Sequence, residues 1–437
     1  FAGEAAGAKL TRVSTALSEA GARYTVLTDP ASLAWVFNVR GSDVPHTPVP
    51  LGFAILDAKG RHAIYLDERK LDAETRAHLE PLARLRPPQA LEADLRELAA
   101  SADPVALDPA LAAEKLRLVV KDAGGRVVSM PDPARIPRAT KNGSELDGAR
   151  AAHRRDGAAL AKFLCWLDAQ EAGAVDEIAA VNRLEDARRA IGDATQMPLR
   201  EISFDTISGA GPNGAIIHYR VTTRTNRTLG NGELYLVDSG GQYQDGTTDI
   251  TRTVAIGSPS PEMRRHYTLV LKGLIGLSQM RYPTGTRGAD IDVIARAALW
   301  KAGLDYAHGT GHGVGSFLSV HEGPQRISKT GTEKLLPGMI LSNEPGFYKE
   351  GAYGIRLENL IVVTPPEKTS GGEMAMHGFE TLTLVPFDRR LIDIELLSDD
   401  ERGWLDAYHA RVLAEIGPMV DGETLAWLES ATEALPT

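Results

Sequence analysis

Four acidic residues stand within or directly after apolar segments in the second half of the chain. Asp238 follows LYLV, Glu358 interrupts IRLENLIVV, and Asp249 and Glu344 lie in comparable settings. Burying four carboxylates near one another is costly unless cations balance their charge. The acids could instead pair with nearby arginines or face solvent independently, but metal binding accounts for the whole set more completely.

Four histidines accompany these acids. AHGTGHGVG places His308 and His312 four residues apart, which on a helix would put both imidazoles on one face. Its glycines oppose a helix, so we expect a loop in which the two imidazoles need not share a metal. His321 in SVHEGP and His218 in AIIHYR complete the group. One histidine alone is usually structural, but four beside strand-borne acids favour a metal-dependent active site.

The segment GAGPNG, at 209–214, matches the GxGxxG pattern of dinucleotide-binding loops. Such a loop is followed by a helix. The segment that follows here, AIIHYRVTT, is rich in β-branched residues and predicts a strand. We therefore do not expect a nucleotide site.

The segments that position these residues predict an α+β domain. Helices are expected at about 144–173 and on to about 191, at 261–280 and 289–303, and in a tail that begins near 398. Short strands are expected from Glu201 onward, and again from MILSNEPGFY to FETLTLVPF. This order favours a largely antiparallel sheet.

Two acid-bearing segments share one layout. LYLVDSGGQYQDGTTDITRTVAI and MILSNEPGFYKEGAYGIRLENLIVV each run from an apolar strand to an acid, a tyrosine, a turn, a second acid and another strand. Two hairpins that each offer two carboxylates would suit a pseudo-two-fold axis. We favour an internal duplication, although hairpins in any antiparallel domain resemble one another.

The preceding part of the chain predicts a smaller α/β domain without a cluster of metal ligands. Helical and strand-like segments alternate there, and PLGFAILDA with HAIYLDE predicts a hairpin. PDPARIPRATKNGSELDGAR carries three prolines ahead of a helix start, which places the boundary near Arg138. Residues 1–137 are thus expected to form the first domain and 138–437 the second.

Composition narrows the functional class. The net charge is −10, which argues against nucleic-acid binding because contacts with phosphate need clustered Lys and Arg. No apolar run approaches the ~20 residues of a membrane span, and no signal peptide is visible. The single cysteine, Cys165, fits a reducing compartment. We therefore expect a cytoplasmic protein without membrane or nucleic-acid partners.

Around these residues the sequence resembles the pita-bread metallopeptidases of family M24, and among them aminopeptidase P (Xaa-Pro aminopeptidase). The matching stretches are VDSGGQY with DGTTDITRT, HGTGHGVGSFLSVHEGP, SNEPGFY and GIRLENL, and similarity extends to WVFNVRGSDVPHTPVP. The step from His312 to His321 and the long tail are similar to the longer, cytosolic-type branch. The resemblance implies a creatinase-like N-terminal domain followed by a pita-bread catalytic domain.

The order Asp238, Asp249, His312, Glu344 and Glu358 corresponds to the family's complete ligand set for two divalent ions. The resemblance implies that Asp238 chelates one ion, that Asp249 and Glu358 bridge both, and that His312 and Glu344 complete the other. Carboxylate-rich ligation with one imidazole suits Mn²⁺ first, with Zn²⁺ or Co²⁺ as alternatives. A hydroxide that bridges the ions would hydrolyse the bond between an N-terminal residue and a following proline.

The resemblance also implies roles for the other residues, with proline-containing peptides as substrates. Glu344 is expected to shuttle protons, and Arg356 to orient nearby acids. His218 and His321 are expected to position the substrate carbonyls and stabilise the oxyanion. His308 is expected to line the pocket for the proline ring.

Three other functions remain open within this fold: a prolidase restricted to dipeptides, a metal-free relative such as creatinase, and a non-catalytic protein-binding module. The full ligand set opposes the last two, and the tail with HGVGSFLSVHEGP opposes the first. The longer branch usually carries another domain ahead of the two expected here, so this chain is expected to begin at the second domain of that plan. In relatives the first domain supports dimerisation, and the expected homodimer depends on it.

Overall fold

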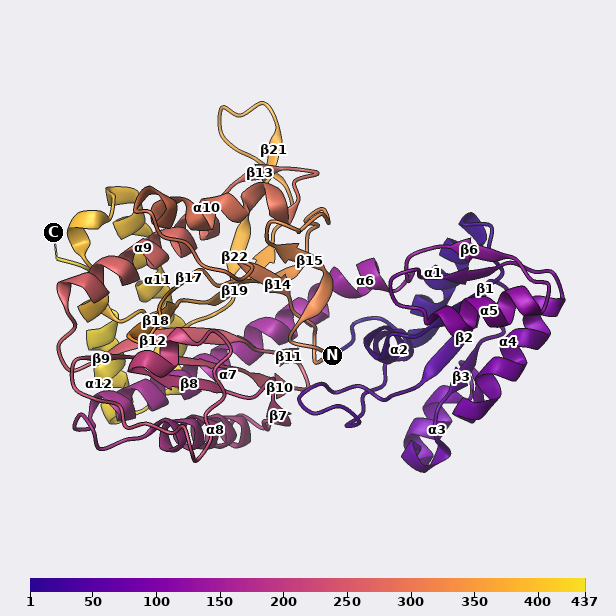
Figure 1. Ribbon diagram of the computed structural model, residues 1–437, viewed down its shortest axis with the longest axis horizontal. Coiled ribbons are helices and arrows are strands. Elements are labelled where there is room, and N and C mark those ends of the chain that lie inside the picture. The colour runs from indigo at the N-terminus through magenta and orange to yellow at the C-terminus, as the bar shows by residue number, and fades with distance from the viewer. Residues whose placement is uncertain (437) are drawn as a thin grey trace. The chain divides into compact units, whose positions relative to one another are not determined.

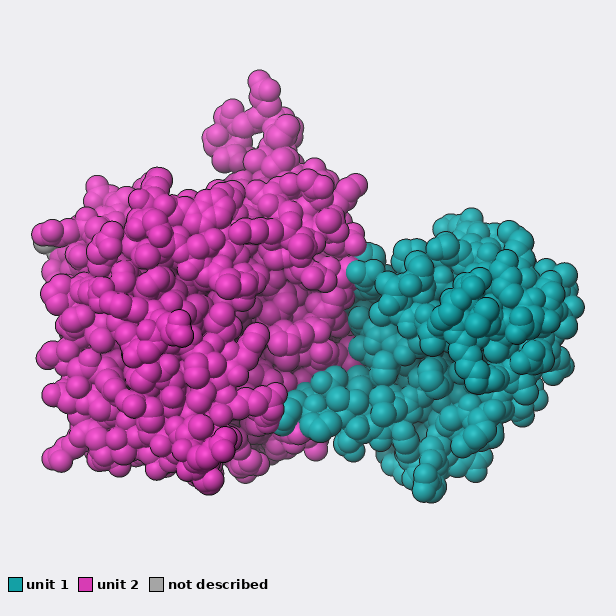
Figure 2. Space-filling view, viewed as in Figure 1, with its two compact units in different colours: residues 1–139 teal, residues 140–437 magenta. Residues whose placement is uncertain are grey.

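The computed structural model describes residues 1–436, and Figure 1 shows the course of the chain. The chain divides into two compact units, which Figure 2 colours separately. Unit 1 comprises Phe1–Ala139, and unit 2 begins at Thr140. The sequence placed this boundary after residue 137, within the short helix α6 (Arg135–Ala139) that ends unit 1.

Unit 1 is an α/β fold built on one six-stranded sheet, with the strand order β4-β3-β2-β1-β5-β6. The pairs β1–β2 and β2–β3 are antiparallel, whereas β1–β5, β5–β6 and β3–β4 are parallel. The hairpin predicted from PLGFAILDA and HAIYLDE is β2 with β3. The elements of unit 1 are α1 (Ala6–Glu19), β1 (Tyr24–Leu27), α2 (Pro30–Phe37), β2 (Phe53–Asp57), β3 (Ala63–Tyr65), η1 (Glu68–Lys70), α3 (Ala73–Leu79), β4 (Arg84–Arg86), η2 (Pro88–Ala90), α4 (Leu91–Ala100), β5 (Val105–Leu107), α5 (Glu114–Asp122), β6 (Val127–Ser129) and α6.

Unit 2 contains every helix that the sequence predicted for it. Several begin at capping residues, whose side chains satisfy backbone N–H groups that the first turn leaves without partners. Asn142 with Glu145 and Ser398 with Glu401 form capping boxes at the first and the penultimate helix. The helices are α7 (Gly143–Asp168), α8 (Glu177–Ala194), η3 (Gly211–Ala215), α9 (Pro261–Ser278), α10 (Gly288–Lys301), η4 (Arg389–Leu391), η5 (Ile394–Leu396), α11 (Asp399–Ile416), η6 (Gly417–Met419) and α12 (Gly422–Ala431). No helix within residues 1–436 combines the length and apolar character that a membrane crossing requires.

The strands of unit 2 pair only in the antiparallel sense within the described residues, as the sequence predicted. The two sheets that concern the site have the orders β12-β9-β8 and β15-β14-β16-β19-β22. The strands are β7 (Glu201–Ile202), β8 (Ile207–Ala210), β9 (Glu233–Ser239), β10 (Gly241–Tyr243), β11 (Gly246–Thr247), β12 (Ile250–Ile256), β13 (Tyr282–Pro283), β14 (Gly311–Gly313), β15 (Glu322–Ile327), β16 (Ile340–Asn343), β17 (Gly346–Lys349), β18 (Tyr353–Arg356), β19 (Asn359–Val363), β20 (Glu367–Lys368), β21 (Ala375–His377) and β22 (Phe379–Thr381).

The core of unit 2 forms around α9, whose apolar residues are buried together with residues of β9, β17, β18 and the C-terminal helices. Tyr267, Leu271, Leu274 and Ile275 of this helix are fully buried. The tail helices α11 and α12 contribute to the same core, since Leu405, Val412 and Leu428 belong to it. The tail is thus an integral part of unit 2.

The two acid-bearing segments fold in the same way, as nested hairpins. In the first, β9 pairs with β12 and encloses the small pair β10–β11. In the second, β16 pairs with β19 and encloses β17–β18. Each outer pair therefore carries two acids at the same end, where one strand finishes and its partner starts. The layout predicted from the sequence is present, and its origin by duplication stays a prediction.

The strand predicted at AIIHYRVT is wrong. Most of GAGPNG instead belongs to the 3₁₀ helix η3, and the residues beyond η3 form a turn and an irregular loop. A buried acid explains this course, because the Glu177 carboxylate accepts hydrogen bonds from Asn213 Nδ2 at 2.9 Å, Tyr219 OH at 3.0 Å and the Arg227 N–H at 3.1 Å. Polar groups of this loop thus bind a side chain on α8, not a neighbouring strand.

Gly354 allows β18 to approach the η3 segment. A Cβ added at Gly354 would lie 1.7 Å from the Gly214 carbonyl oxygen, so any side chain there would push the two backbones apart. We predict that Gly354→Ala lowers the free energy of unfolding by about 1–3 kcal/mol, the usual cost of overpacking. Thermal or urea unfolding measures this loss.

Gly403→Ala is the matched control. Gly403 lies on the exposed side of α11 with nothing within 4 Å of its added Cβ. Alanine there should leave stability unchanged or raise it by up to about 1 kcal/mol, because glycine is a poor helix former. Equal losses in the two variants would contradict the close approach at Gly354.

Candidate metal centre

One cavity of unit 2, of about 540 Å³, collects the side chains that the sequence singled out. Its lining includes all nine of them: His218, Asp238, Asp249, His308, His312, His321, Glu344, Arg356 and Glu358. They come from segments that span 140 positions of the chain. The fold therefore brings the acids and the histidines to a single place.

The nested hairpins position the four acids. Asp238 is the penultimate residue of β9 and Asp249 directly precedes β12, while Glu344 directly follows β16 and Glu358 directly precedes β19. The two hairpins also touch, since the Glu358 N–H donates to the Thr251 carbonyl at 3.1 Å. The four carboxylates meet because both hairpins present their acid-bearing ends to one another.

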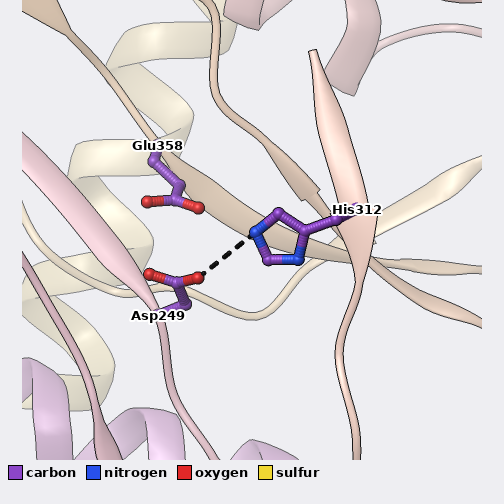
Figure 3. A group of neighbouring side chains, drawn as sticks. All are labelled: Asp249, His312 and Glu358. Atoms are coloured by element: carbon purple, nitrogen blue, oxygen red, sulfur yellow. Dashed lines mark ion pairs between the residues drawn. The ribbon is translucent and has the colours of Figure 1, made fainter. Parts of the chain in front are cut away.

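His312 completes a potential ligand group. Its Nε2 lies 3.5 Å from Asp249 Oδ2 and 3.5 Å from Glu344 Oε1. Figure 3 shows the side chains of Asp249, His312 and Glu358 pointing toward one another. The other ring nitrogen, Nδ1, lies 3.0 Å from the Gly313 carbonyl oxygen, to which it can only donate. In the neutral form of this ring, Nδ1 carries the proton and the Nε2 lone pair faces the acids.

The donor set fits a divalent metal ion. One ligand atom from each of Asp249, His312 and Glu358 lies within 4.8 Å of the others. Asp238 Oδ1 and Asp249 Oδ1 are buried and have no hydrogen-bond partner within residues 1–436. Buried carboxylate oxygens without partners are costly, and a bound cation would satisfy them. Oxygen-rich ligation with one imidazole is compatible with Mn²⁺, Zn²⁺ or Co²⁺.

The acids raise one another's pKa in the absence of such cations. Burial raises the pKa of Asp249 well above its ordinary value, and repulsion from Asp238 and Glu344 raises it further. The pKa of Glu358 is raised well above its ordinary value by burial and then by Asp249 and Glu344. Burial also raises the pKa of Glu344. Divalent ions would reverse this effect by favouring the charged carboxylates.

The loop predicted for AHGTGHGVG is partly wrong, because His312 lies on a strand, β14. The glycines around it permit close packing of strands: a Cβ at Gly311 would lie 1.9 Å from the Ser342 carbonyl oxygen, and one at Gly313 would lie 2.3 Å from that of Glu322. The glycines that favour a loop in the sequence thus allow three strands to pack closely. His308 does lie in a loop, as predicted.

A chain of hydrogen bonds joins His308 to the acids. Arg356 Nη2 donates to Asp238 Oδ2 at 2.7 Å, and Arg356 Nη1 donates to the Tyr348 hydroxyl, also at 2.7 Å. Tyr348 in turn lies 2.9 Å from His308 Nε2. Because arginine only donates, the Tyr348 hydroxyl accepts from Arg356 and donates its own proton to His308 Nε2. His308 is neutral, since burial lowers its pKa to about 4.

The other two histidines lie in the cavity beside the potential ligands. The His321 ring packs edge-on against the His312 ring, with 4.2 Å between centroids. Desolvation, together with His312 and His218, lowers the pKa of His321 to about 4, so this imidazole is also neutral near pH 7. The His218 loop is fixed next to the site, because Arg356 Nη1 donates to the Ile217 carbonyl at 3.3 Å.

Three hydroxyl residues at the site were not singled out from the sequence. Thr251 donates to Glu358 Oε2 at 2.8 Å, Ser342 donates to Glu344 Oε1 at 3.2 Å, and Tyr348 bridges His308 and Arg356. Strand alternation could have indicated Thr251, since it stands two residues beyond Asp249 on the same strand face. Tyr348 was noted only as the counterpart of Tyr243 in the repeated layout. Tyr243 instead donates to Asp156 at 3.1 Å, away from the acids.

A buried arginine supports the backbone behind the acids. Arg252 is 1 % exposed, and burial lowers its pKa. Its Nη1 donates to the Glu358 carbonyl at 2.6 Å, and its Nη2 donates to the Asn359 side chain at 2.8 Å and to the hydroxyl of Tyr408 on α11 at 3.0 Å. Neutral oxygens thus solvate this cation, and the start of β19 is tied to the C-terminal tail.

Comparisons with known protein families assign the whole chain. Residues 147–365 match metallopeptidase family M24, residues 1–145 match the creatinase/prolidase N-terminal domain, and residues 375–435 match the C-terminal region of peptidase M24. The order of these matches confirms the predicted fold class, a creatinase-type α/β domain followed by a pita-bread domain with an extension.

Individual relatives cover nearly the full chain. A probable Xaa-Pro aminopeptidase P of Metarhizium robertsii is 41% identical over 425 residues, which are 92% of this chain and 68% of the relative. The crystal structure of a Caenorhabditis elegans X-prolyl aminopeptidase, described as a cytosolic enzyme with a di-nuclear active site, is 33% identical with a TM-score of 0.92, over 99% of this chain and 71% of that one. An Xaa-Pro dipeptidase from Bacillus anthracis is 25% identical with a TM-score of 0.69, over 88% of this chain and 99% of that one.

The raised pKa values predict how pH affects the metal-free protein. Because the folded-state pKa values of Asp249 and Glu358 exceed those of the unfolded chain, their contribution to stability is present at acidic pH. It is lost as pH rises through the raised values. A divalent ion binds the deprotonated acids, so Mn²⁺ should raise the melting temperature more at about pH 8 than at about pH 5.

Thermal unfolding of the chelator-treated protein, with and without Mn²⁺, measures this difference. The double variant Asp249→Asn with Glu358→Gln is the control, since it lacks both titrating groups and should respond little to the metal at either pH. The same stabilisation at both pH values in the wild-type protein would contradict the arrangement of acids described above.

Proposed function

Because the chain belongs to metallopeptidase family M24, we propose that it is an Xaa-Pro aminopeptidase, which hydrolyses the bond between an N-terminal residue and a following proline. The observation that carries the proposal is the convergence of four carboxylates and one histidine in a cavity that three further histidines also line. The relatives named Xaa-Pro aminopeptidase P and X-prolyl aminopeptidase, which match almost the whole chain, support the choice of reaction.

Two divalent ions are the cofactor of this proposal, with Mn²⁺ as the first candidate. Asp238, Asp249, His312, Glu344 and Glu358 would hold them, with the lone pair of His312 Nε2 already directed at the acids. When bound, such a pair of ions makes hydroxide available from water near neutral pH and polarises the carbonyl to be attacked. The free N-terminal amine of a peptide, in its neutral form, would offer such ions a further nitrogen ligand.

Glu344 is the proposed proton carrier. It is partly exposed to the cavity, while its carboxylate accepts a hydrogen bond from Ser342 and its backbone N–H donates to the Thr310 carbonyl at 2.8 Å. These contacts fix both the backbone and the side chain. A carboxylate held in this way can take a proton from the attacking water and pass it to the leaving proline nitrogen.

The three histidines beside His312 are suited to bind the substrate. An imidazole ring offers an N–H donor, and we assign His321 and His218 to the substrate carbonyl and to the negative charge that develops on it. His308 already uses both ring nitrogens, on the Gly309 carbonyl and on Tyr348. It therefore offers its ring face, as a wall for the proline ring. Arg356 orients Asp238 and the His218 loop.

A dipeptidase restricted to Xaa-Pro is the second candidate, supported by the structural similarity to the dipeptidase described above. The homodimer, the cytoplasmic location and the identity of the metal stay predictions.

Substrate length separates the two candidates. We expect the Mn²⁺-loaded protein to release arginine from Arg-Pro-Pro, and chelation to abolish this activity because the acids need their counter-ions. Liberated amino acid, followed by chromatography, measures turnover. Hydrolysis of an Xaa-Pro dipeptide alone would favour the dipeptidase, and no turnover of either peptide would overturn the proposed function.

Glu344→Ala removes a metal ligand and the proton carrier together. We predict that kcat falls by about 10²–10⁴-fold or more, the usual contribution of a positioned acid or base. Glu350→Ala is the control, since Glu350 is exposed in the turn between β17 and β18 and should not change the rate. Near-normal activity of the Glu344 variant would remove this residue from the site.

A further inference from the structure

Arg326 lines the cavity, and none of the roles above uses it. It lies on β15, the strand beside β14 in Figure 1. The register of this antiparallel pair places Arg326 directly opposite His312. Opposed residues of an antiparallel pair project from the same face of the sheet. The Arg326 side chain therefore leaves the same face as the potential metal ligand, and it is exposed.

The Arg326 guanidinium is available to bind a ligand. Two cationic side chains line the cavity, Arg326 and Arg356, and Arg356 is committed to Asp238 and Tyr348. Within residues 1–436, no ion pair or side-chain hydrogen bond engages Arg326. A guanidinium carries five N–H donors in a planar fork that matches a carboxylate.

The backbone that carries this side chain is held firmly. A Cβ at Gly288 would lie 1.8 Å from the Arg326 carbonyl oxygen, and one at Gly331 would lie 2.3 Å from it. These close approaches fix the strand position on both sides. Ser328 and Thr330 line the cavity beyond Arg326 and extend its polar edge with two hydroxyl groups. The arginine is thus an exposed cation on a closely packed strand.

The charges along the cavity match those of a short peptide. In the proposed function the metal-binding residues receive the N-terminal end of the peptide, and Arg326 would attract an anionic group further along the same peptide. We propose that Arg326 is a specificity-determining residue that binds a carboxylate of the substrate beyond the proline. This inference rests on the proposed function. The carboxylate could be the C-terminus of a short peptide or an acidic side chain, and both offer arginine the same planar acceptor.

Two matched pairs of peptides distinguish these sources. Ala-Pro-Ala and its C-terminal amide differ only in the terminal carboxylate. Ala-Pro-Glu amide and Ala-Pro-Gln amide differ only in the side chain. For each pair, the ratio of kcat/KM for the acid to kcat/KM for the neutral partner measures the preference. We expect a ratio of about 2 to 5 for at least one pair, as for an exposed ion pair, and a lower ratio at high salt.

Three variants assign that preference to Arg326. Arg326→Ala should bring the ratio close to one, and Arg326→Lys should retain part of it, because lysine keeps the charge but loses the fork. Lys329→Ala is the control for the loss of a nearby positive charge. Lys329 belongs to the same segment but is absent from the cavity lining, and its ammonium lies 3.9 Å from Asp305. That variant should keep the wild-type ratio.

A wild-type ratio near one for both pairs would overturn the inference, as would an unchanged ratio in Arg326→Ala. Calorimetric binding of the same peptides to the Mn²⁺-loaded protein provides a readout that does not depend on turnover. If the wild-type protein cleaves neither pair, the proposed function fails, and calorimetry alone decides the role of Arg326. If the peptides that carry the carboxylate bind more tightly, and this difference disappears in Arg326→Ala, the role of Arg326 is supported. Equal binding of each carboxylate peptide and its neutral partner would refute that role.

Discussion

Mutual repulsion among four carboxylates is the constraint on which the organisation of unit 2 depends. A fold gains nothing from placing Asp238, Asp249, Glu344 and Glu358 together unless it can bind cations there, since each buried charge carries a desolvation cost of its own. Hydrogen bonds and the hairpin backbone hold the four acids in place despite this desolvation cost. Hydroxyl donors reach Glu358 and Glu344, a guanidinium reaches Asp238, and both hairpins fix the acids through their backbone. The site is therefore formed by the chain itself, in a geometry that cations can complete.

Much of this could be predicted from the sequence, because the relevant signals are local. An acid at the end of an apolar strand is visible as a pattern, and so is its repetition in a second segment with the same order of features. The helices were also predictable, since capping residues such as Asn142 and Ser398 mark their starts. The nine site residues follow from these patterns together with the family resemblance. Their convergence in one cavity required the structure, and their individual roles stay proposals.

Predictions from the sequence were wrong where contacts between distant residues override local secondary-structure preference. The β-branched residues around Ile216 suggest a strand, yet Glu177, some forty residues earlier, binds the polar groups of that segment and prevents it. The glycines around His312 suggest a loop, yet they permit close contacts between strands. Tyr348 and Tyr243 occupy equivalent places in the repeated layout but serve different partners. In each case the deciding atom lies on another element, which no local pattern can reveal.

The contact between Arg252 and Tyr408 has a consequence for how the chain can be shortened. The tail from Ser398 onward looks like an appendage in sequence, and trimming it would be a natural way to obtain a minimal catalytic fragment. Removal of α11 would take away the Tyr408 hydroxyl and open the pocket around a guanidinium that has no carboxylate partner within residues 1–436. Water would then reach the backbone that precedes β19, and with it Glu358. The smallest fragment that keeps its metal-binding residues in place therefore extends at least through α11.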